Sequence, residues 1–233
     1  MKKLKTLAIA LGVVAIANSA LATATLWIWD DLSTASALAL PTGIASYANA
    51  SFDAGNWSIV ITTAETKGVP GIGSATAPAM DLNIQATSLG TSGHNLHVSW
   101  SDDAFGPLNA SLTAAMTGHV VTGTGAGVTY QTYYHTGAGV LTTPTPPGTS
   151  VPPWTLLTDS GTLSPPAYMS SQTGALNQSS FGLAEYVTLV SSPGGIYSLD
   201  ASIGGTGVPD GGTTVMLLGA ALSGLACLRR KMA

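Results

Sequence analysis

The stretch NLHVSWS, residues 95–101, decides the fold class, because its apolar and polar side chains alternate without a break. Leu96, Val98 and Trp100 fall on one parity, and the polar residues fall on the other (Asn95, His97, Ser99 and Ser101). Successive side chains of a β-strand point to opposite faces of the sheet. The pattern therefore predicts a strand with one buried face and one face in water.

Two further stretches repeat this alternation, residues 80–86 and residues 196–203. Their apolar side chains share one parity within each stretch (Leu82, Ile84 and Ala86; Tyr197, Leu199, Ala201 and Ile203). Other strand candidates are bounded by Gly, Pro, Asn or Asp, and they cover residues 25–30, 57–63, 110–121, 128–135 and 184–190. The segment SSPGG, residues 191–195, lies between two such runs and predicts a hairpin loop.

Short strands with one face in water favour an antiparallel sandwich over a parallel α/β sheet. We therefore expect an all-β fold in which residues 23–207 form a single antiparallel β-sandwich, of either jelly-roll or Ig-like strand order. The proline-rich stretch 142–153 is either a linker between two domains or a long loop of one domain. The loop is favoured because neither side of this stretch has enough predicted strands to form a domain by itself. Residues 157–174 are also expected to be loop.

The N-terminus has the layout of a secretory signal peptide. Lys2, Lys3 and Lys5 precede an apolar run at residues 7–17, and the small residues Ala20 and Ala22 follow at cleavage-site spacing. Eleven helical residues span only about 17 Å, against roughly 30 Å for the hydrocarbon core of a bilayer. We expect a signal helix at residues 1–22 with cleavage after Ala22, and Ala24 is the nearest alternative.

Charge excludes several kinds of partner. Among all Lys and Arg residues, Lys67 alone lies between residues 23 and 207, and every acidic residue except Asp210 lies there too. The body thus carries a net charge of about −9 and has no basic patch for nucleic acid or for an anionic membrane surface. The only cysteine, Cys227, lies near the C-terminus, so the body has no disulfide; lipidation of Cys227 is a minor alternative.

Few residues suggest metal chemistry. His94 and His97 are three residues apart, and on a strand their side chains point to opposite faces, which argues against a metal pair. The adjacent carboxylates of Asp102-Asp103 and Asp30-Asp31 could bind calcium, but no calcium-loop pattern surrounds them. Water-facing turns are the favoured interpretation, and no metal or cofactor is expected.

Trp27 and Trp29 share one face of the first predicted strand. They form either a flat aromatic platform for a sugar ring or part of the core, and the core is favoured. No nucleophile elbow or zinc-protease motif is present, and no pair of carboxylates has a spacing that demands catalysis. We therefore expect a protein that is not an enzyme.

The C-terminus has three consecutive parts. Val208, Pro209, Asp210, Gly211 and Gly212 form a turn-prone motif; residues 213–228 carry no charge; and a basic cluster follows (Arg229, Arg230 and Lys231). The uncharged segment would form about 24 Å of helix, short for a bilayer but sufficient with snorkelling arginines. We expect a transmembrane helix whose basic end stops in the cytoplasm, with the body outside.

This order of motif, apolar helix and basic cluster resembles the PEP-CTERM class of exosortase sorting signals. The segment VPDGGTT is most similar to the Val-Pro-Asp-Ser-Gly variant (VPDSG-CTERM), with Gly211 in place of Ser. The resemblance covers residues 208–233. It implies a Gram-negative exported protein that is held in the inner membrane, processed by exosortase near residues 208–212, and then delivered to the cell surface or extracellular matrix, where exopolysaccharide is a partner.

Three functional classes follow from these observations. The leading one is a non-catalytic structural or interaction β-domain at the cell surface or in the matrix. The second is a carbohydrate-binding module that uses Trp27 and Trp29 on exopolysaccharide. The third is a hydrolase without a recognisable motif.

Overall fold

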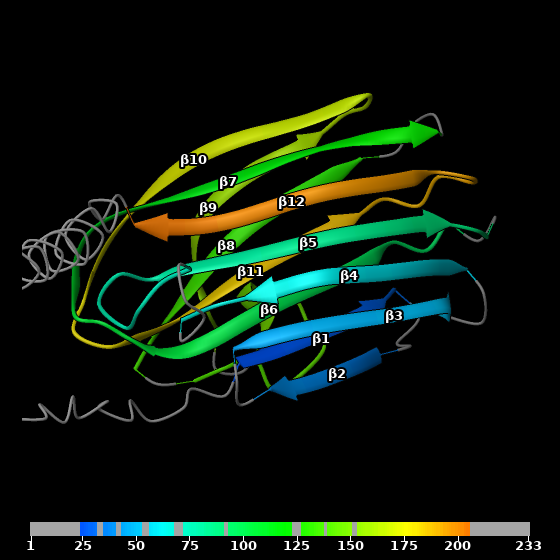
Figure 1. Ribbon diagram of the computed structural model, residues 1–233. Coiled ribbons are helices and arrows are strands. Elements are labelled where there is room, and N and C mark those ends of the chain that lie inside the picture. Colours follow the sequence, from blue (N-terminus) through cyan, green and yellow to red (C-terminus); the bar gives the residue numbers. More distant parts are fainter. Residues whose placement is uncertain are drawn as a thin grey trace, which may run out of the picture.

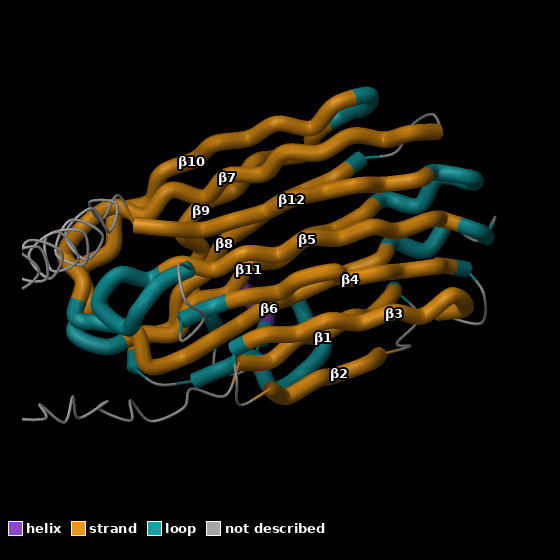
Figure 2. Tube along the Cα trace, viewed as in Figure 1, coloured by secondary structure: helices purple, strands orange, loops and turns teal. Residues whose placement is uncertain are grey.

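The computed structural model describes residues 24–31, 35–40, 43–52, 56–67, 72–90, 93–122, 127–137, 139–150 and 153–205. These residues form two antiparallel sheets that pack face to face, which confirms the all-β sandwich (Figure 1). Strands dominate the fold, and loops gather at the two ends of the strands (Figure 2). No helix among the described residues has the length and apolarity to cross a membrane. The expected signal helix and the expected membrane helix at residues 213–228 lie outside them.

Sheet A has the strand order β2-β1-β6-β11-β8-β9. Its strands are β1 (Ala24–Asp30), β2 (Ala35–Leu40), β6 (Leu96–Phe105), β8 (Val128–Thr136), β9 (Thr155–Leu163) and β11 (Phe181–Leu189). Sheet B has the order β10-β7-β12-β5-β4-β3. Its strands are β3 (Ile44–Phe52), β4 (Trp57–Glu65), β5 (Ala79–Ser88), β7 (Leu108–Thr122), β10 (Ala167–Gln178) and β12 (Ile196–Gly205).

The last two strands of the chain lie in the middle of the sheets. β11 is inserted between β6 and β8 in sheet A, and β12 is inserted between β5 and β7 in sheet B. Figure 1 shows β12, in orange, with strands of much earlier sequence on both sides. Both sheets therefore depend on pairings between segments that are far apart in sequence.

The inter-sheet core confirms the alternation that was read from the sequence. Leu96, Val98 and Trp100 are fully buried, and so are the apolar residues predicted on β5 and β12. The two largest core side chains also satisfy their polar atoms: Trp57 Nε1 donates to the carbonyl oxygen of His94 at 3.0 Å, and Trp100 Nε1 donates to that of Glu65 at 3.0 Å. Both buried indole N–H groups therefore have a hydrogen-bond acceptor.

Four strands were not predicted, and all four are sheet edges: β2, β9, β3 and β10. The expectation of loop at residues 157–174 is wrong, because this stretch supplies most of β9 and two thirds of β10. Edge strands are more exposed, and here they are rich in Ser, Thr, Gly and Ala, so their apolar alternation is weak. The hairpin predicted at residues 191–195 is also wrong, since β11 and β12 belong to different sheets.

The outer face of sheet A is not in water as predicted. Ser99 and Ser101 are fully buried there, beneath residues 139–150 and 153–154, which we call the strap. The strap contains one 3-10 turn at Pro147–Thr149 and no strand. Leu141 fixes it by both of its backbone groups: its N–H donates to Ser101 Oγ at 3.1 Å, and its carbonyl oxygen accepts from Trp27 Nε1 at 2.9 Å.

A second hydrophobic cluster fills the space between the strap and sheet A. Its buried members are Trp29, Tyr133, Leu141, Trp154, Ala184 and Tyr186, and Trp27 packs against them. The strap approaches β11 so closely that a Cβ atom at Gly182 would lie 2.4 Å from the carbonyl oxygen of Gly139. Glycine is therefore required at residue 182 on steric grounds.

The prediction that Asp102 lies in a water-facing turn is wrong. Its side chain is fully buried, and Oδ2 lies 2.7 Å from both Lys67 Nζ and Thr66 Oγ1. Lys67 also donates to the backbone oxygen of Asp103, and its ammonium lies 4.1 Å from the ring centroid of Phe105. Lys67, the only Lys or Arg between residues 23 and 207, is thus paired with a buried carboxylate.

A buried carboxyl group bridges the two sheets. Glu185 on β11 is fully buried; its Oε1 lies 2.7 Å from the hydroxyl of Tyr130, which lies 2.9 Å from the carbonyl oxygen of Ser202 on β12. Desolvation raises the pKa of Glu185 well above its usual value. The Tyr130 hydroxyl is the donor toward both Glu185 Oε1 and the Ser202 carbonyl oxygen, and it links β11 of sheet A to β12 of sheet B.

Candidate functional site

One end of sheet A brings together residues from three strands. β6 lies between β1 and β11, and the antiparallel register places Trp29 opposite His97 and His97 opposite Thr188. All three positions share the outer face, because residues of one parity on each strand point the same way. Asp31 follows the end of β1 and comes within reach of the same histidine.

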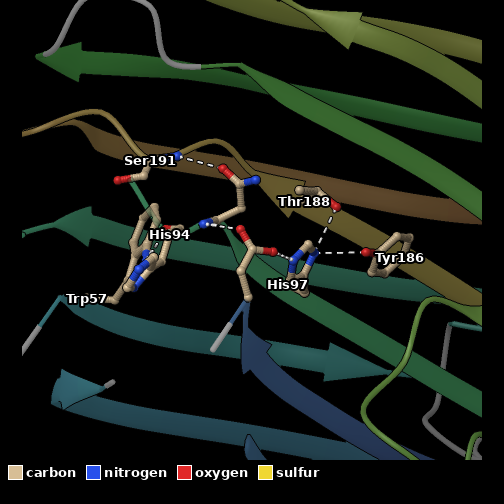
Figure 3. Close-up of polar contacts among 8 residues, drawn as sticks. Trp57, His94, His97, Tyr186, Thr188 and Ser191 are labelled. Atoms are coloured by element: carbon tan, nitrogen blue, oxygen red, sulfur yellow. Dashed lines mark hydrogen bonds and ion pairs between the residues drawn. The ribbon is translucent and has the colours of Figure 1, made fainter. Parts of the chain in front are cut away.

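His97 lies at the centre of a chain of hydrogen bonds (Figure 3). Its Nε2 lies 2.8 Å from Asp31 Oδ1, and its Nδ1 lies 2.8 Å from the Tyr186 hydroxyl and 3.2 Å from Thr188 Oγ1. The second oxygen of Asp31 accepts the backbone N–H of Asn95 at 2.9 Å. Both ring nitrogens of His97 therefore have partners within the protein.

The partners fix where the protons lie. An ionised carboxylate only accepts, so the proton between Asp31 and His97 lies on Nε2 of the ring. Burial raises the pKa of Tyr186, so its hydroxyl keeps its proton and donates to Nδ1. Desolvation raises the pKa of Asp31, but hydrogen bonds from His97 and Asn95 outweigh it, and the pKa lies below its usual value. Asp31 therefore remains ionised at neutral pH.

Aromatic rings form a wall at this end of the sheet. The centroids of Trp29 and His97 are 5.3 Å apart with an interplanar angle of 24°, and those of Trp29 and Tyr186 are 5.7 Å apart at 12°. Offset stacking of this kind stabilises the rings beyond their burial. The indole of Trp29 is only 5% exposed, so the wall is rigid and mostly covered.

A pocket of about 460 Å³ opens against this wall. Its lining combines the end of β1, the start of β6 and the strap: Trp29, Asp30, Asp31, His97, Pro144 and Pro146. The volume lies within the range of small-molecule sites, and a few polar groups among apolar surfaces are their usual lining. Another pocket, of about 300 Å³, lies on sheet B beside Asn83, His119 and Asp200, but no aromatic ring except His119 lines it.

The Asp31, His97 and hydroxyl arrangement differs from a nucleophilic triad in one decisive respect. In such a triad the carboxylate is buried and the hydroxyl meets the substrate. Here the Asp31 side chain is 42% exposed, whereas Tyr186 is buried and Thr188 is half-buried. The exposed group of this hydrogen-bonded chain is the Asp31 carboxylate, which can only accept hydrogen bonds. It is therefore suited to binding a ligand that donates a hydrogen bond, and not to nucleophilic attack.

Comparisons with known proteins bear on the end of the chain rather than on the pocket. The comparison with curated proteins finds no match. A family model described as the VPDSG-CTERM motif matches residues 207–232. The chain carries a VPDSG-CTERM sorting motif.

The VPDSG-CTERM motif confirms the resemblance drawn from the tail and marks an exported protein that is targeted to exosortase. Its individual residues, Val208 to Gly212, and the basic cluster 229–231 lie outside the described residues. The expected cleavage residues Ala20 and Ala22 lie outside them as well. Their roles remain predictions from the sequence.

The structure separates the two tryptophans from the inter-sheet core. Trp27 and Trp29 share a face, as predicted, but it is the outer face of sheet A, where the strap covers them. The expectation that they fill core is confirmed for Trp29, which is buried in this second cluster, and in part for Trp27, which packs against it. Trp27 is only partly buried, and its N–H is engaged with Leu141.

The remaining candidates do not form a metal centre. His94 and His97 do not act as a pair; His97 binds Asp31, and the backbone of His94 binds Trp57. Asp30 is 2% exposed rather than in a water-facing turn. Across the residues that the structure describes, no group of three or more His, Cys, Asp or Glu side chains could hold a metal ion.

The sequence analysis missed the site around His97. Asp31 and Thr188 are 66 and 91 residues from His97, and no local motif joins them. Strand parity alone could have placed Trp29, His97, Tyr186 and Thr188 on outward faces. The missing information was the strand order, because only the adjacency of β1, β6 and β11 brings these faces together.

Proposed function

We propose that this chain is an exported protein of a Gram-negative bacterium that reaches the cell surface or extracellular matrix after processing by exosortase. Its β-sandwich is a structural and interaction domain and not an enzyme. The observation that carries the proposal is the VPDSG-CTERM motif at residues 207–232. The acidic body, with its single buried base, agrees with a partner other than nucleic acid.

The topology of the tail explains a transient membrane stage. The uncharged segment 213–228 enters the inner membrane, and Arg229, Arg230 and Lys231 hold its end in the cytoplasm. Pro209 disfavours helix at Val208, and Gly211-Gly212 separates the motif from the apolar segment. The backbone of residues 208–212 is then accessible to the processing enzyme outside the bilayer.

The geometry of the pocket supports a domain without catalytic activity. Both nitrogens of His97 are engaged, and the exposed member of its hydrogen-bonded chain is a carboxylate. A general base or a nucleophile needs an open position toward its substrate. Binding, rather than bond cleavage, is what this arrangement supports.

The test replaces Pro209-Asp210 with Ala-Ala in the producing cell and leaves the apolar segment intact. A full-length form should accumulate in the inner membrane, because the motif read by exosortase is gone. The matched control is Thr213-Thr214→Ala-Ala, which changes the two residues just after Val208–Gly212 and should be processed normally. Normal surface delivery and an unchanged mass for the first variant would reject sorting and leave a simple membrane anchor.

A second candidate function is carbohydrate binding, and the pocket beside Trp29 favours it. The sugar site is then the pocket lined by the Trp29–His97 wall and the strap prolines, not an open platform of Trp27 and Trp29. Isothermal titration of the full-length chain with fragments of the cell's own exopolysaccharide tests this. Absence of heat at millimolar fragment concentration would remove carbohydrate binding and leave the sorting proposal unaffected.

A further inference from the structure

The pocket beside His97, which we call the slot, is lined by both aromatic and proline side chains. Trp29 and His97, whose rings stack on each other, line it from sheet A, and Pro144 and Pro146 line it from the strap. Leu141 and the 3-10 turn at Pro147–Thr149 hold the strap on either side of these prolines. The slot is therefore built by the fold, and flat C–H surfaces suit both its aromatic and its proline side chains.

The slot presents the carboxylate of Asp31 without a Lys or Arg beside it. The nearest bases are the imidazoles of His97 and His94, which lower the pKa of Asp31. Asp31 presents a partly exposed carboxylate whose two oxygens are oriented by the His97 ring and the Asn95 amide. Lys67 is the only Lys or Arg of the body, and it is paired with Asp102, five residues further along β6 than His97. Five strand residues span roughly 16 Å, so Lys67 does not neutralise Asp31.

These two features select the ligand by charge. An anionic unit, such as a uronate or a sugar phosphate, would meet the carboxylate of Asp31 without a Lys or Arg to pair with it. An ammonium group would instead make a charge-assisted hydrogen bond with the carboxylate. A ring that carries it would lie against the aromatic wall and the prolines, which also favours a cation near the indole.

We propose that the slot formed by Trp29, Asp31, His97, Pro144 and Pro146 binds an ammonium-bearing sugar unit of a polysaccharide, with Asp31 as the residue that recognises the ammonium group. The inference rests on the second candidate function, carbohydrate binding, and adds the charge class of the sugar. It makes the domain a receptor for partly deacetylated amino-sugar polymers rather than for acidic ones.

The experiment uses the purified full-length chain in detergent and isothermal titration at pH 6. The probes are glucosamine oligomers, the same oligomers fully N-acetylated, uronate oligomers, and a lysine oligopeptide. Glucosamine oligomers should bind at least tenfold more tightly than the acetylated or acidic ones. Asp31→Asn should remove that preference, whereas Asp159→Asn, which neutralises an exposed carboxylate on β9, should keep it. Asp31→Glu keeps the charge at a different reach, and thermal unfolding of each variant shows that the fold is intact.

Each alternative result has a definite meaning. Equal binding of free-amine and acetylated oligomers, unaffected by Asp31→Asn, would overturn the charge selection but keep carbohydrate binding. Equal binding of the lysine peptide, lost in Asp31→Asn, would assign the slot to a cationic peptide and overturn the sugar. Failure of every probe to bind would overturn this inference, while processing of the Pro209-Asp210 variant would still decide the proposed function on its own.

Discussion

Lys67 and Asp102 form an ion pair inside the sandwich, with Nζ 2.7 Å from Oδ2 and side-chain exposures of 9% and 0%. Burial lowers the pKa of Lys67, and the neighbouring Asp102 opposes that shift. A buried pair adds little net stability compared with apolar side chains of the same size, but removal of one partner leaves an uncompensated charge. The pair therefore fixes how the segment after β4 joins the end of β6.

The first prediction concerns this pair. Lys67→Met should lower the free energy of unfolding by about 3–5 kcal/mol, because Asp102 would stay buried without a cation. The double variant Lys67→Met with Asp102→Leu should recover most of the loss. Urea denaturation checks both. Single and double variants of equal stability would show that Asp102 is not desolvated as described.

The second prediction concerns Glu185. Burial raises its pKa above its usual value of 4.5, so the folded protein keeps a proton that the unfolded chain has released above that pH. The contribution of Glu185 to the free energy of unfolding should be greatest below pH 4.5 and should be lost as the pH rises through the folded pKa. Glu185→Gln cannot ionise, and its stability should fall less between pH 5 and pH 8.

Urea midpoints of both proteins at pH 5 and pH 8 measure this difference. Asp81, whose pKa burial and the charges of Asp200 and Glu65 raise to about 6, contributes in the same direction in both proteins. The comparison therefore isolates Glu185. Parallel pH profiles would mean that burial does not raise the pKa of Glu185 in the folded protein.

The third prediction concerns the tryptophans under the strap. Trp29→Ala should destabilise the protein by about 3–5 kcal/mol, since a large buried side chain is lost. Trp27→Phe should cost only about 1 kcal/mol, because it removes one hydrogen bond to Leu141 and keeps an aromatic ring. Denaturant melts provide both values. Unchanged stability of Trp29→Ala, combined with lost polysaccharide binding, would instead favour an exposed sugar platform.

The fourth prediction tests how closely the strap lies on sheet A. Gly182→Ala would place a Cβ atom 2.4 Å from the Gly139 oxygen, so the strap must shift and stability should fall by about 1–3 kcal/mol. Gly204→Ala on β12 is the matched control, because its nearest neighbour is 3.8 Å away. Limited proteolysis should cut residues 139–154 faster in the first variant only. Equal cleavage in both would argue against the close packing.

The fifth prediction concerns divalent cations. Addition of EDTA should leave the melting temperature unchanged, because no cluster of metal-binding side chains occurs among the described residues. Calcium bound between adjacent carboxylates would stabilise the folded state by mass action. A melting temperature that drops with EDTA and returns with calcium would require a metal site.

Strand periodicity predicted the interior of the sandwich well. The alternation at residues 80–86, 95–101 and 196–203 is a local property, and the core needs only apolar side chains at every second position. Edge strands such as β10 escaped detection because they bury fewer side chains. Parity also placed Trp27 and Trp29 on one face, but it cannot say which face a later segment will cover.

The pocket could not be predicted for a related reason. Asp31, His97 and Thr188 come together through the order β1-β6-β11, and that order depends on the competition among all strand pairings. The proline-rich segment resembled a solvent-exposed loop, since nothing in its composition reveals that Leu141 and Trp154 pack onto sheet A. Likewise, Asp102 gave no sign of its pairing with Lys67, 35 residues earlier.

The central positions of β11 and β12 have a consequence for chains whose synthesis stops early. A product that stops before Phe181 would lack the strand that joins β2-β1-β6 to β8-β9 and the strand that joins β10-β7 to β5-β4-β3. Only two residues, Thr206 and Gly207, separate the end of β12 from Val208, the first residue of VPDGG. The C-terminal part of the chain therefore supplies the central strand of each sheet and also the sorting motif. A chain truncated before Phe181 lacks both central strands and the sorting motif, so an incomplete domain of this kind is not targeted to exosortase.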